Sequence, residues 1–367
     1  MLSRRHFLQA TAAGLMAAGT GRLTLAAGLN REPLILSAVD DPAGKHFIAG
    51  IDLQGRPRFR LPVADRCHGG CARPASDQAL LFARRPGRHF YVVDTARGET
   101  VATIAAGTDH HFYGHGVFSP DGRFLYVTMN HYTTSEGLVR VYDADRNYRA
   151  VRDMPVDGIG PHELRLHPDG ETLIVALGGI ETHPDYDRIK LNLDTMQPAL
   201  LLMDRHSGKI RERHEPSHHQ LSCRHLDVSP DGIVIAGYQY QGPEWETPPL
   251  IARLDTRRGT FDEISLPDDL QPRLRNYTAS IACSHTGPYT VVTAPRGGLV
   301  VVINHATGAL VRHLDVADVA GALPLADDSF VVSSGNGSVQ RIHADSAGTE
   351  TLSHSDMRWD NHLTLFG

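Results

Sequence analysis

The sequence contains no block of lysine and arginine residues, and its formal net charge is −6. Proteins that bind nucleic acid usually carry a basic stripe or patch, so we do not expect nucleic acid as a partner. After a short apolar stretch near the N-terminus, no run is long and apolar enough to cross a bilayer. We therefore expect no integral membrane segment.

Several catalytic signatures are also absent. The chain has no Gly-x-Ser-x-Gly elbow, phosphate-binding loop, dinucleotide fingerprint or Cys-x-x-Cys-His haem site. This excludes several common enzyme classes and leaves open whether the protein is an enzyme. A Pro/Gly/Ser-rich linker is missing as well, so the 367 residues predict one large domain rather than two.

Cysteine is scarce, with four residues: Cys67, Cys71, Cys223 and Cys283. The Cys67-x-x-x-Cys71 spacing matches neither a zinc ribbon nor a haem attachment site. A disulfide, free buried thiols and thiolate ligands all remain open from the spacing. Histidine, in contrast, is unusually frequent, with 22 copies.

The first residues read "MLSRRHFLQATAAGLMAAGTGRLTLAAG". Ser3-Arg4-Arg5-His6-Phe7-Leu8 fits a twin-arginine export signal, and the weakly apolar stretch that follows is too short to span a membrane. We predict a signal peptide over residues 1–27 and a periplasmic mature protein over residues 28–367, exported by the twin-arginine pathway.

A repeat of about 40 to 50 residues runs through the rest of the chain. Its clearest copies are "HGVFSPDG" at His115, "HELRLHPDG" at His162 and "HLDVSPDG" at His225. Each copy continues as three further short strands with period-2 alternation and Asp-Gly or Asn punctuation. Four strands per repeat predict an all-β fold, a seven-bladed β-propeller.

The count of seven needs one blade that is shared between the two ends of the chain. "PLILSAV", "KHFIAGIDL" and "RPRFRLPV" form three N-terminal strands without an inner strand before them. His362 to Phe366 predicts an inner strand with nothing after it. Pairing these segments completes the seventh blade and leaves no open sheet edge.

The first strand of each blade lines the central channel, so the residues that open the seven repeats should surround one axis. These residues are His68, His115, His162, His225, Ser280, Gly321 and His362. Five of the seven are histidine. Nearby polar residues predict a second shell or ligand pocket: Glu163, His131, His183, Tyr277 and Asp360.

A ring of histidines on rigid strands suits a transition metal, because neutral imidazole is a common ligand of iron, copper, zinc and nickel. We predict a metal site formed by His68, His115, His162, His225 and His362. Iron and copper are the expected metals, and zinc is a third candidate. A metal-free site for a polar ligand and a purely structural ring are the alternatives.

The repeat "SPDGRFLYVT…VRVYDA" resembles YVTN-type and WD-type propeller repeats. The whole mature chain resembles an uncharacterised bacterial family of twin-arginine-exported propeller proteins. The matching segments are "FYGHGVFSPDG", "GIGPHELRLHPDG", "THPDYDRIKLNLDTMQPAL", "YQGP" and "WDNHL". The resemblance implies iron or another redox metal, and partners of the imelysin and di-haem peroxidase-like types. The two cysteines of "RCHGGCARP" depart from that family and suggest extra thiolate ligands or a local disulfide.

Three functions compete. The first is a periplasmic metal-binding accessory protein in metal uptake or redox handling. The second is a metal-dependent hydrolase, lactonase or oxidoreductase, in which a metal-bound water attacks and Glu163 or a ring histidine is the general base. The third is a metal-free protein-interaction platform.

Overall fold

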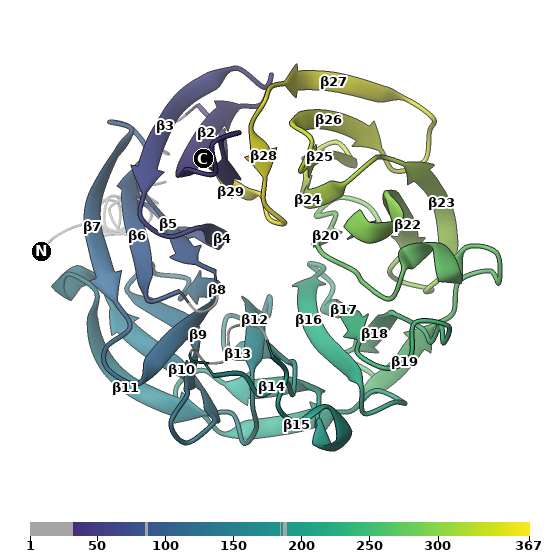
Figure 1. Cartoon of the computed structure of the whole chain (residues 1–367), viewed down its shortest axis with the longest axis horizontal. Helices are drawn as coiled ribbons and strands as arrows, with labels where there is room; N and C mark the ends of the chain where they lie inside the picture. Colours follow the sequence, from purple (N-terminus) through teal and green to yellow (C-terminus); the bar gives the residue numbers. More distant parts are fainter. Residues whose placement is uncertain (1–31, 85–86, 184, 186–188) are drawn as a thin grey trace, which may run out of the picture. The chain divides into compact units, whose positions relative to one another are not determined.

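The computed structural model describes residues 32–84, 87–183, 185 and 189–367. The predicted signal peptide, residues 1–27, lies outside these residues. Figure 1 shows the unit Pro33–Gly367 as β-sheets placed around a central axis. Within the described residues the strands form seven antiparallel sheets, so the predicted all-β, seven-bladed propeller is confirmed.

Six blades each consist of four strands that are consecutive in the chain. The first contains β4 (Cys67–Ala72), β5 (Gln78–Ala83), β6 (His89–Asp94) and β7 (Glu99–Ala105). The second contains β8 (His110–Phe118), β9 (Phe124–His131), β10 (Glu136–Asp143) and β11 (Arg149–Pro155). The third contains β12 (Pro161–Leu166), β13 (Thr172–Leu177), β14 (Ala199–Asp204) and β15 (Ile210–His214).

The next three blades follow the same order. The fourth contains β16 (Leu221–Val228), β17 (Ile233–Tyr240), β18 (Ile251–Asp255) and β19 (Thr260–Ile264). The fifth contains β20 (Ile281–Cys283), β21 (Tyr289–Ala294), β22 (Leu299–Asn304) and β23 (Leu310–Asp315). The sixth contains β24 (Val319–Pro324), β25 (Ser329–Ser334), β26 (Ser338–His343) and β27 (Thr349–His354). Short 3₁₀ helices lie in the loops: η1 (Ala144–Arg146), η3 (Leu193–Thr195), η4 (Gln271–Leu274) and η5 (Pro295–Gly297).

The remaining sheet contains strands from both ends of the chain. Its strands are β1 (Leu34–Asp40), β2 (His46–Asp52), β3 (Pro57–Val63), β28 (Arg358–Trp359) and β29 (Thr364–Phe366). Both β28 and β29 pair antiparallel with β1. The predicted inner strand from His362 to Phe366 contains β29, and a further short strand, β28, precedes it and pairs with β1 as well, so that His362 lies between the two strands.

The Pro-Asp-Gly turns that revealed the repeat have the same structure in three blades. Gly122, Gly170 and Gly232 have φ values of 70°, 72° and 80°. Each glycine N–H donates to the carbonyl three residues earlier, at 2.9 Å. Only glycine adopts this left-handed conformation without a steric cost, so the turn sequence determines where each inner strand ends.

The core lies between neighbouring sheets. The second and third strands are largely buried, as in β13, where all six residues are buried. The fourth strands alternate between half-buried and exposed residues, as in β23. Aromatic rings join adjacent blades, and the rings of Phe90 and Phe112 lie 5.6 Å apart. Within the described part of the chain, we find no helix with the length and apolar character that a membrane crossing requires.

Candidate metal centre

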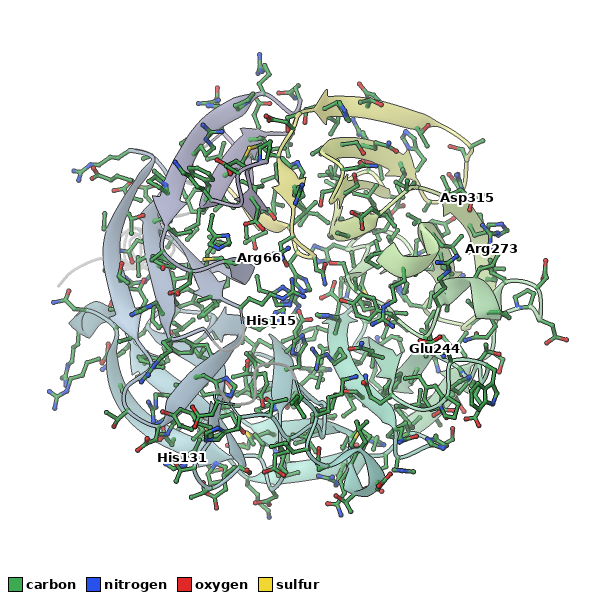
Figure 2. The ribbon with its side chains drawn as sticks, in the orientation of Figure 1. Arg66, His115, His131, Glu244, Arg273 and Asp315 are labelled. Atoms are coloured by element: carbon green, nitrogen blue, oxygen red, sulfur yellow. The ribbon has the colours of Figure 1, made fainter. Side chains whose placement is uncertain are left out.

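Four inner strands carry a histidine at a β-bulge. The pairing register shifts at Cys67/Gly70, Phe112/Gly116, Pro161/Glu163 and Cys223/His225. A bulge bends its strand and turns a side chain away from the direction that strict alternation would give it. The bulges coincide with His68, His115, His162 and His225, and Figure 2 shows His115 beside the central axis.

Four of the five predicted ligands form a tight group, which we call the histidine cluster: His68, His115, His225 and His362. One ligand atom from each lies within 4.8 Å of the others. The ring centroid of His362 lies 4.5, 4.6 and 4.6 Å from those of the other three. A tetrahedral ion with bonds of about 2.1 Å holds its nitrogens about 3.4 Å apart, so the widest pair needs to close by about 1.4 Å or less. The cluster can therefore hold one metal ion.

The Nδ1 atoms of the cluster face oxygen atoms. His68 Nδ1 lies 2.7 Å from Asp360 Oδ1, and His225 Nδ1 lies 3.0 Å from Glu163 Oε2. His115 Nδ1 lies 3.6 Å from Glu163 Oε1, and His362 Nδ1 lies 3.4 Å from Ser280 Oγ. Such partners fix the ring orientation and leave Nε2 as the ligand atom.

The Nε2 atoms of two cluster members support this assignment. In the described structure, Nε2 of His115 and Nε2 of His362 are both buried and have no hydrogen-bond partner. A buried polar atom without a partner is costly and needs an explanation. A bound cation would supply the missing interaction for both atoms.

The two carboxylates behind the rings are themselves held by arginines. Asp360 is 1% exposed and contacts Arg66 at 2.8 Å and Arg84 at 3.2 Å. Despite burial, the pKa of Asp360 lies well below its usual value, because His68 and the arginines stabilise its charge. It therefore stays ionised and accepts a hydrogen bond from His68 Nδ1–H.

Glu163 has the same role for the other side of the cluster. It is 1% exposed, and Arg165 Nη2 lies 2.8 Å from its Oε1. Arg165 also contacts Asp227, at 3.4 Å. The Glu163 carboxylate lies on the Nδ1 side of His115 and His225, which places it as an orienting group for these rings. A general base would instead need to reach the Nε2 side, where a metal-bound water would lie.

The electrostatics keep the cluster neutral. Burial lowers the pKa of His115, His225 and His362 well below the ordinary value, and neighbouring histidines or arginines lower it further. Burial also lowers the pKa of His68, although Asp360 opposes the shift. Neutral imidazole is the form that binds a metal ion.

His162 lies beside the cluster but outside it. Its ring centroid is 4.8 Å from that of His225 and 5.2 Å from that of His115. It is buried, and neither ring nitrogen has a hydrogen-bond partner among the described residues. Burial and the charge of Arg224 hold its pKa well below the ordinary value. The structure thus brings all five predicted histidines together and separates His162 from the four that converge.

The two blades whose repeats open without histidine make room for the C-terminal segment. Ser280 Oγ donates to the carbonyl of Asn361 at 2.8 Å. A Cβ atom at Gly321 would lie 2.9 Å from Leu363 Cγ and 3.3 Å from the carbonyl carbon of His362. His362 therefore enters the cluster from the connection between β28 and β29.

We expect Gly114→Ala to disrupt the cluster. Gly114 has φ +104°, and an added Cβ would lie 2.9 Å from His68 Cδ2. The backbone strain and the clash together should lower the free energy of unfolding by about 2–4 kcal/mol. Urea denaturation followed by circular dichroism measures this loss.

The matched control is Gly44→Ala. Gly44 has φ +78°, and nothing lies within 4 Å of an added Cβ. It carries the backbone strain alone, about 1–2 kcal/mol. Equal losses for the two variants would show that the contact with His68 is unimportant.

Two other predicted residues lie elsewhere. Figure 2 shows His131 near the rim of the ring, far from His115, and its ring packs against that of His110 at 4.7 Å. His183 packs against Tyr132 at 5.4 Å. Tyr277, in contrast, lines a pocket above the cluster, and its hydroxyl accepts a hydrogen bond from Asn361 Nδ2 at 2.7 Å.

The cysteines are all free, so the suggested local disulfide is not present in the structure. Burial raises the pKa of the Cys67 thiol well above its usual value, and neighbouring carboxylates raise it further. Its Sγ lies 3.7 Å from the carbonyl oxygen of Asp65. The cysteines also lie outside the group of converging ligand atoms.

Sequence reasoning missed the arginines that surround the site. Arg66 lies two residues before His68, Arg165 two residues after Glu163, and Arg224 directly before His225. Their positions one or two residues from His68, Glu163 and His225 could have predicted that they lie near the site. Alternation along β12 places Glu163 and Arg165 on one face of the strand, whereas Arg66 precedes β4.

A comparison with protein-family models shows which family the chain belongs to. A family model described as "Protein of unknown function (DUF1513)" matches residues 61–366. The chain belongs to the DUF1513 family. No curated protein matches it.

A solved structure has a fold similar to that of this DUF1513 protein. The Kuenenia stuttgartiensis hydrazine synthase is similar with a TM-score of 0.61 over 87% of this chain and 94% of that chain. The sequence identity is 16%. At this identity the likeness shows the fold alone.

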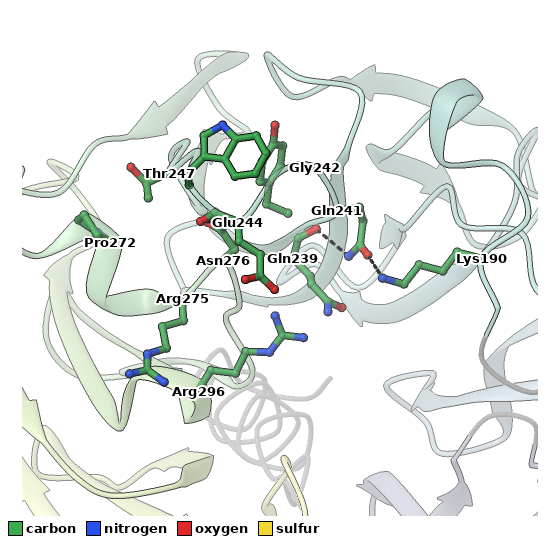
Figure 3. Close-up of a pocket in the computed structure, with 12 residues that line it drawn as sticks. Lys190, Gln239, Gln241, Gly242, Glu244, Thr247, Pro272, Arg275, Asn276 and Arg296 are labelled. Carbon is green, nitrogen blue, oxygen red and sulfur yellow. Dashed lines mark hydrogen bonds between the residues drawn. The ribbon is translucent and has the colours of Figure 1, made fainter.

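Two pockets connect the histidine cluster of the DUF1513 protein to its surface. The inner pocket has a volume of about 340 Å³, and its lining includes His68, His162 and His225. The outer pocket has a volume of about 960 Å³ and is shown in Figure 3. The two pockets share Lys190, Gln239 and Arg296. A ligand can therefore approach the cluster from this side.

Proposed function

We propose that the protein is a periplasmic accessory protein that binds one transition-metal ion, iron or copper, in metal uptake or redox handling. The ligands are Nε2 atoms of His68, His115, His225 and His362. Export follows the twin-arginine pathway through residues 1–27. Imelysin-type and di-haem peroxidase-like proteins are the proposed partners.

One observation carries the proposal: four buried histidines from four different blades converge, and Nδ1 of three of them, His68, His225 and His362, already lies within hydrogen-bond distance of an oxygen atom. Burial and mutual repulsion keep these rings unprotonated, so they offer lone pairs rather than charges. Asp360 contacts Nδ1 of His68 and Glu163 contacts Nδ1 of His225, so the two carboxylates orient these rings, as carboxylates do in metalloprotein sites. Imidazole ligands suit iron, copper and zinc alike, so the donor set favours a transition metal over calcium or magnesium.

The direct test is the metal content of the full chain exported through its own N-terminal segment. We expect about one equivalent of iron or copper by mass spectrometry, with an optical or electron paramagnetic resonance signal from imidazole ligation. Zinc at one equivalent would keep the site and remove the redox role. Protein that contains no transition metal and takes up none on addition would reject the proposal.

A second candidate is a metal-dependent hydrolase or oxidoreductase at the same site. The inner pocket favours it, because the pocket opens directly onto His68 and His225. A fifth coordination position on that side would be accessible to a substrate or water. Metal-dependent turnover of a lactone or phosphoester, lost in His115→Ala, would support this candidate, and its absence across such substrates would leave the accessory role.

A further inference from the structure

The inner pocket has a strongly cationic lining. Arg84, Lys190, Arg224 and Arg296 all border it, and its described lining residues include no aspartate or glutamate. Arg84 is compensated by Asp360, at 3.2 Å. Lys190, Arg224 and Arg296 come from three different blades and border one small volume. A pocket of this kind focuses a positive potential and attracts anions.

Arg296 is the most distinctive of these cations. Its guanidinium carbon lies 5.0 Å from the ring centroid of Tyr277, so the two side chains stack. Among the described residues, Arg296 forms no ion pair. Figure 3 shows it extending into the pocket region beside Gln239. Its hydrogen-bond donors are therefore available to a ligand.

Tyr277 adds a directed donor. Its hydroxyl oxygen accepts a hydrogen bond from Asn361 Nδ2 at 2.7 Å. The hydroxyl hydrogen is then left to donate to another group. Arg296 and Tyr277 thus form a pair in which one side chain carries the charge and the other supplies a fixed O–H donor.

The floor of the pocket provides an independent observation. His162 is 5% exposed, lines the pocket, and has no hydrogen-bond partner for either ring nitrogen among the described residues. It lies beside the histidine cluster without belonging to it. A buried ring with two unsatisfied nitrogens points to a polar ligand that contacts it.

We propose that the inner pocket binds a small polycarboxylate anion through Arg296, Arg224, Lys190 and Tyr277, with His162 beneath it. Cations from three blades favour a ligand with two or more separated carboxylates over a single phosphate, which reaches fewer of them at once. The volume of about 340 Å³ suits a ligand of this size. One carboxylate oxygen then lies next to the ion of the histidine cluster, and this last point alone rests on the proposed function.

The test uses citrate as the probe and the metal-free full chain, so that chelation cannot mimic binding. Isothermal titration should show citrate binding to the unsubstituted protein and an affinity at least about tenfold lower for Arg296→Gln. Arg296→Lys should fall between them, which separates lost charge from a folding defect. The matched control is Arg258→Gln in the β18–β19 turn, where the guanidinium is exposed and remote from the pocket. It should bind citrate as the unsubstituted protein does.

Two outcomes would overturn the inference: no citrate binding at millimolar concentration, or equal affinity in the unsubstituted protein and Arg296→Gln. Inorganic phosphate that binds as tightly as citrate would overturn the polycarboxylate assignment. Metal uptake is measured on separate aliquots of the same proteins, after a transition metal has been added back. Metal binding without citrate binding would reject the anion site and keep the proposed function. Citrate binding that depends on Arg296, in a protein that takes up no metal, would keep the anion site and reject the metal centre.

Discussion

Replacing His115 and His362 together by alanine should lower the affinity for a transition metal by about a thousandfold or more. These two rings have buried Nε2 atoms without any hydrogen-bond partner, so a bound ion is their expected partner. Mutation of one residue that hydrogen-bonds to a metal ligand already lowers metal affinity by about 10- to 100-fold. Here two ligands themselves are removed, so the loss should be larger. Competition with a chelator of known affinity measures the change for copper and zinc.

Folding must be separated from ligation in this experiment. Alanine leaves two cavities, so the pair His115→Phe and His362→Phe, which fills the space with apolar rings, serves as a second variant. Both double variants should lose metal binding, as judged against circular dichroism spectra that match the unsubstituted protein. His167→Ala is the matched control, because His167 contacts Thr256 at 3.0 Å on another part of its blade. Full metal affinity in a folded double variant would contradict the proposed ligand set.

The metal-free protein should lose stability steeply as the pH falls from 6.5 to 5.5. Burial holds the pKa of His115, His162, His225 and His362 well below the ordinary value. In the unfolded chain these histidines titrate near pH 6.5. Between these pKa values the unfolded chain binds protons that the folded protein does not, so the free energy of unfolding rises with pH and falls on acidification.

The expected loss in the free energy of unfolding depends on how many histidines stay neutral in the folded protein. Each ring that stays neutral in the folded state contributes about 1 kcal/mol of loss over this interval, or about 4 kcal/mol for four rings. Urea denaturation at half-unit steps of pH measures it. His162→Leu, which removes one such ring without touching the cluster ligands, should lower the total loss by about a quarter. A free energy of unfolding that is constant or rises on acidification would contradict the buried, neutral state of these histidines.

Local patterns in the sequence were enough to predict the propeller. The Pro-Asp-Gly turns, the alternation of each strand and the repeat length are properties of short segments, and each restricts the backbone directly. The turn glycines Gly122, Gly170 and Gly232 adopt the left-handed conformation that the motif requires. The predicted C-terminal inner strand, His362 to Phe366, contains β29, whereas the additional strand β28 was not predicted, because it consists of two residues that pair with β1.

The sequence predicted which positions form the candidate site, but it did not predict how their side chains are arranged. Equivalent repeats place equivalent residues around the axis, so the five histidines could be named in advance. Bulges at Phe112/Gly116 and Cys223/His225 set the direction of two of the side chains, because a one-residue shift moves a side chain to the other face of a strand. His162 also lies at a bulge, so the strand pattern alone does not separate it from the four that converge. His131 was assigned to the site because its loop opens on the expected face, but the structure places it near the rim.

The sequence by itself determined the repeat, the number of blades, the turn conformations and the ring of histidines, because these follow from local backbone preference and from periodicity. The tertiary structure alone decided which nitrogen of each histidine is available, which carboxylate orients it and which arginine neutralises that carboxylate. These contacts join segments far apart in the chain, such as His68 with Asp360, and Ser37 with the carbonyl of His362. Their energies depend on burial and on mutual distance, which exist only once the ring of blades has closed around its axis.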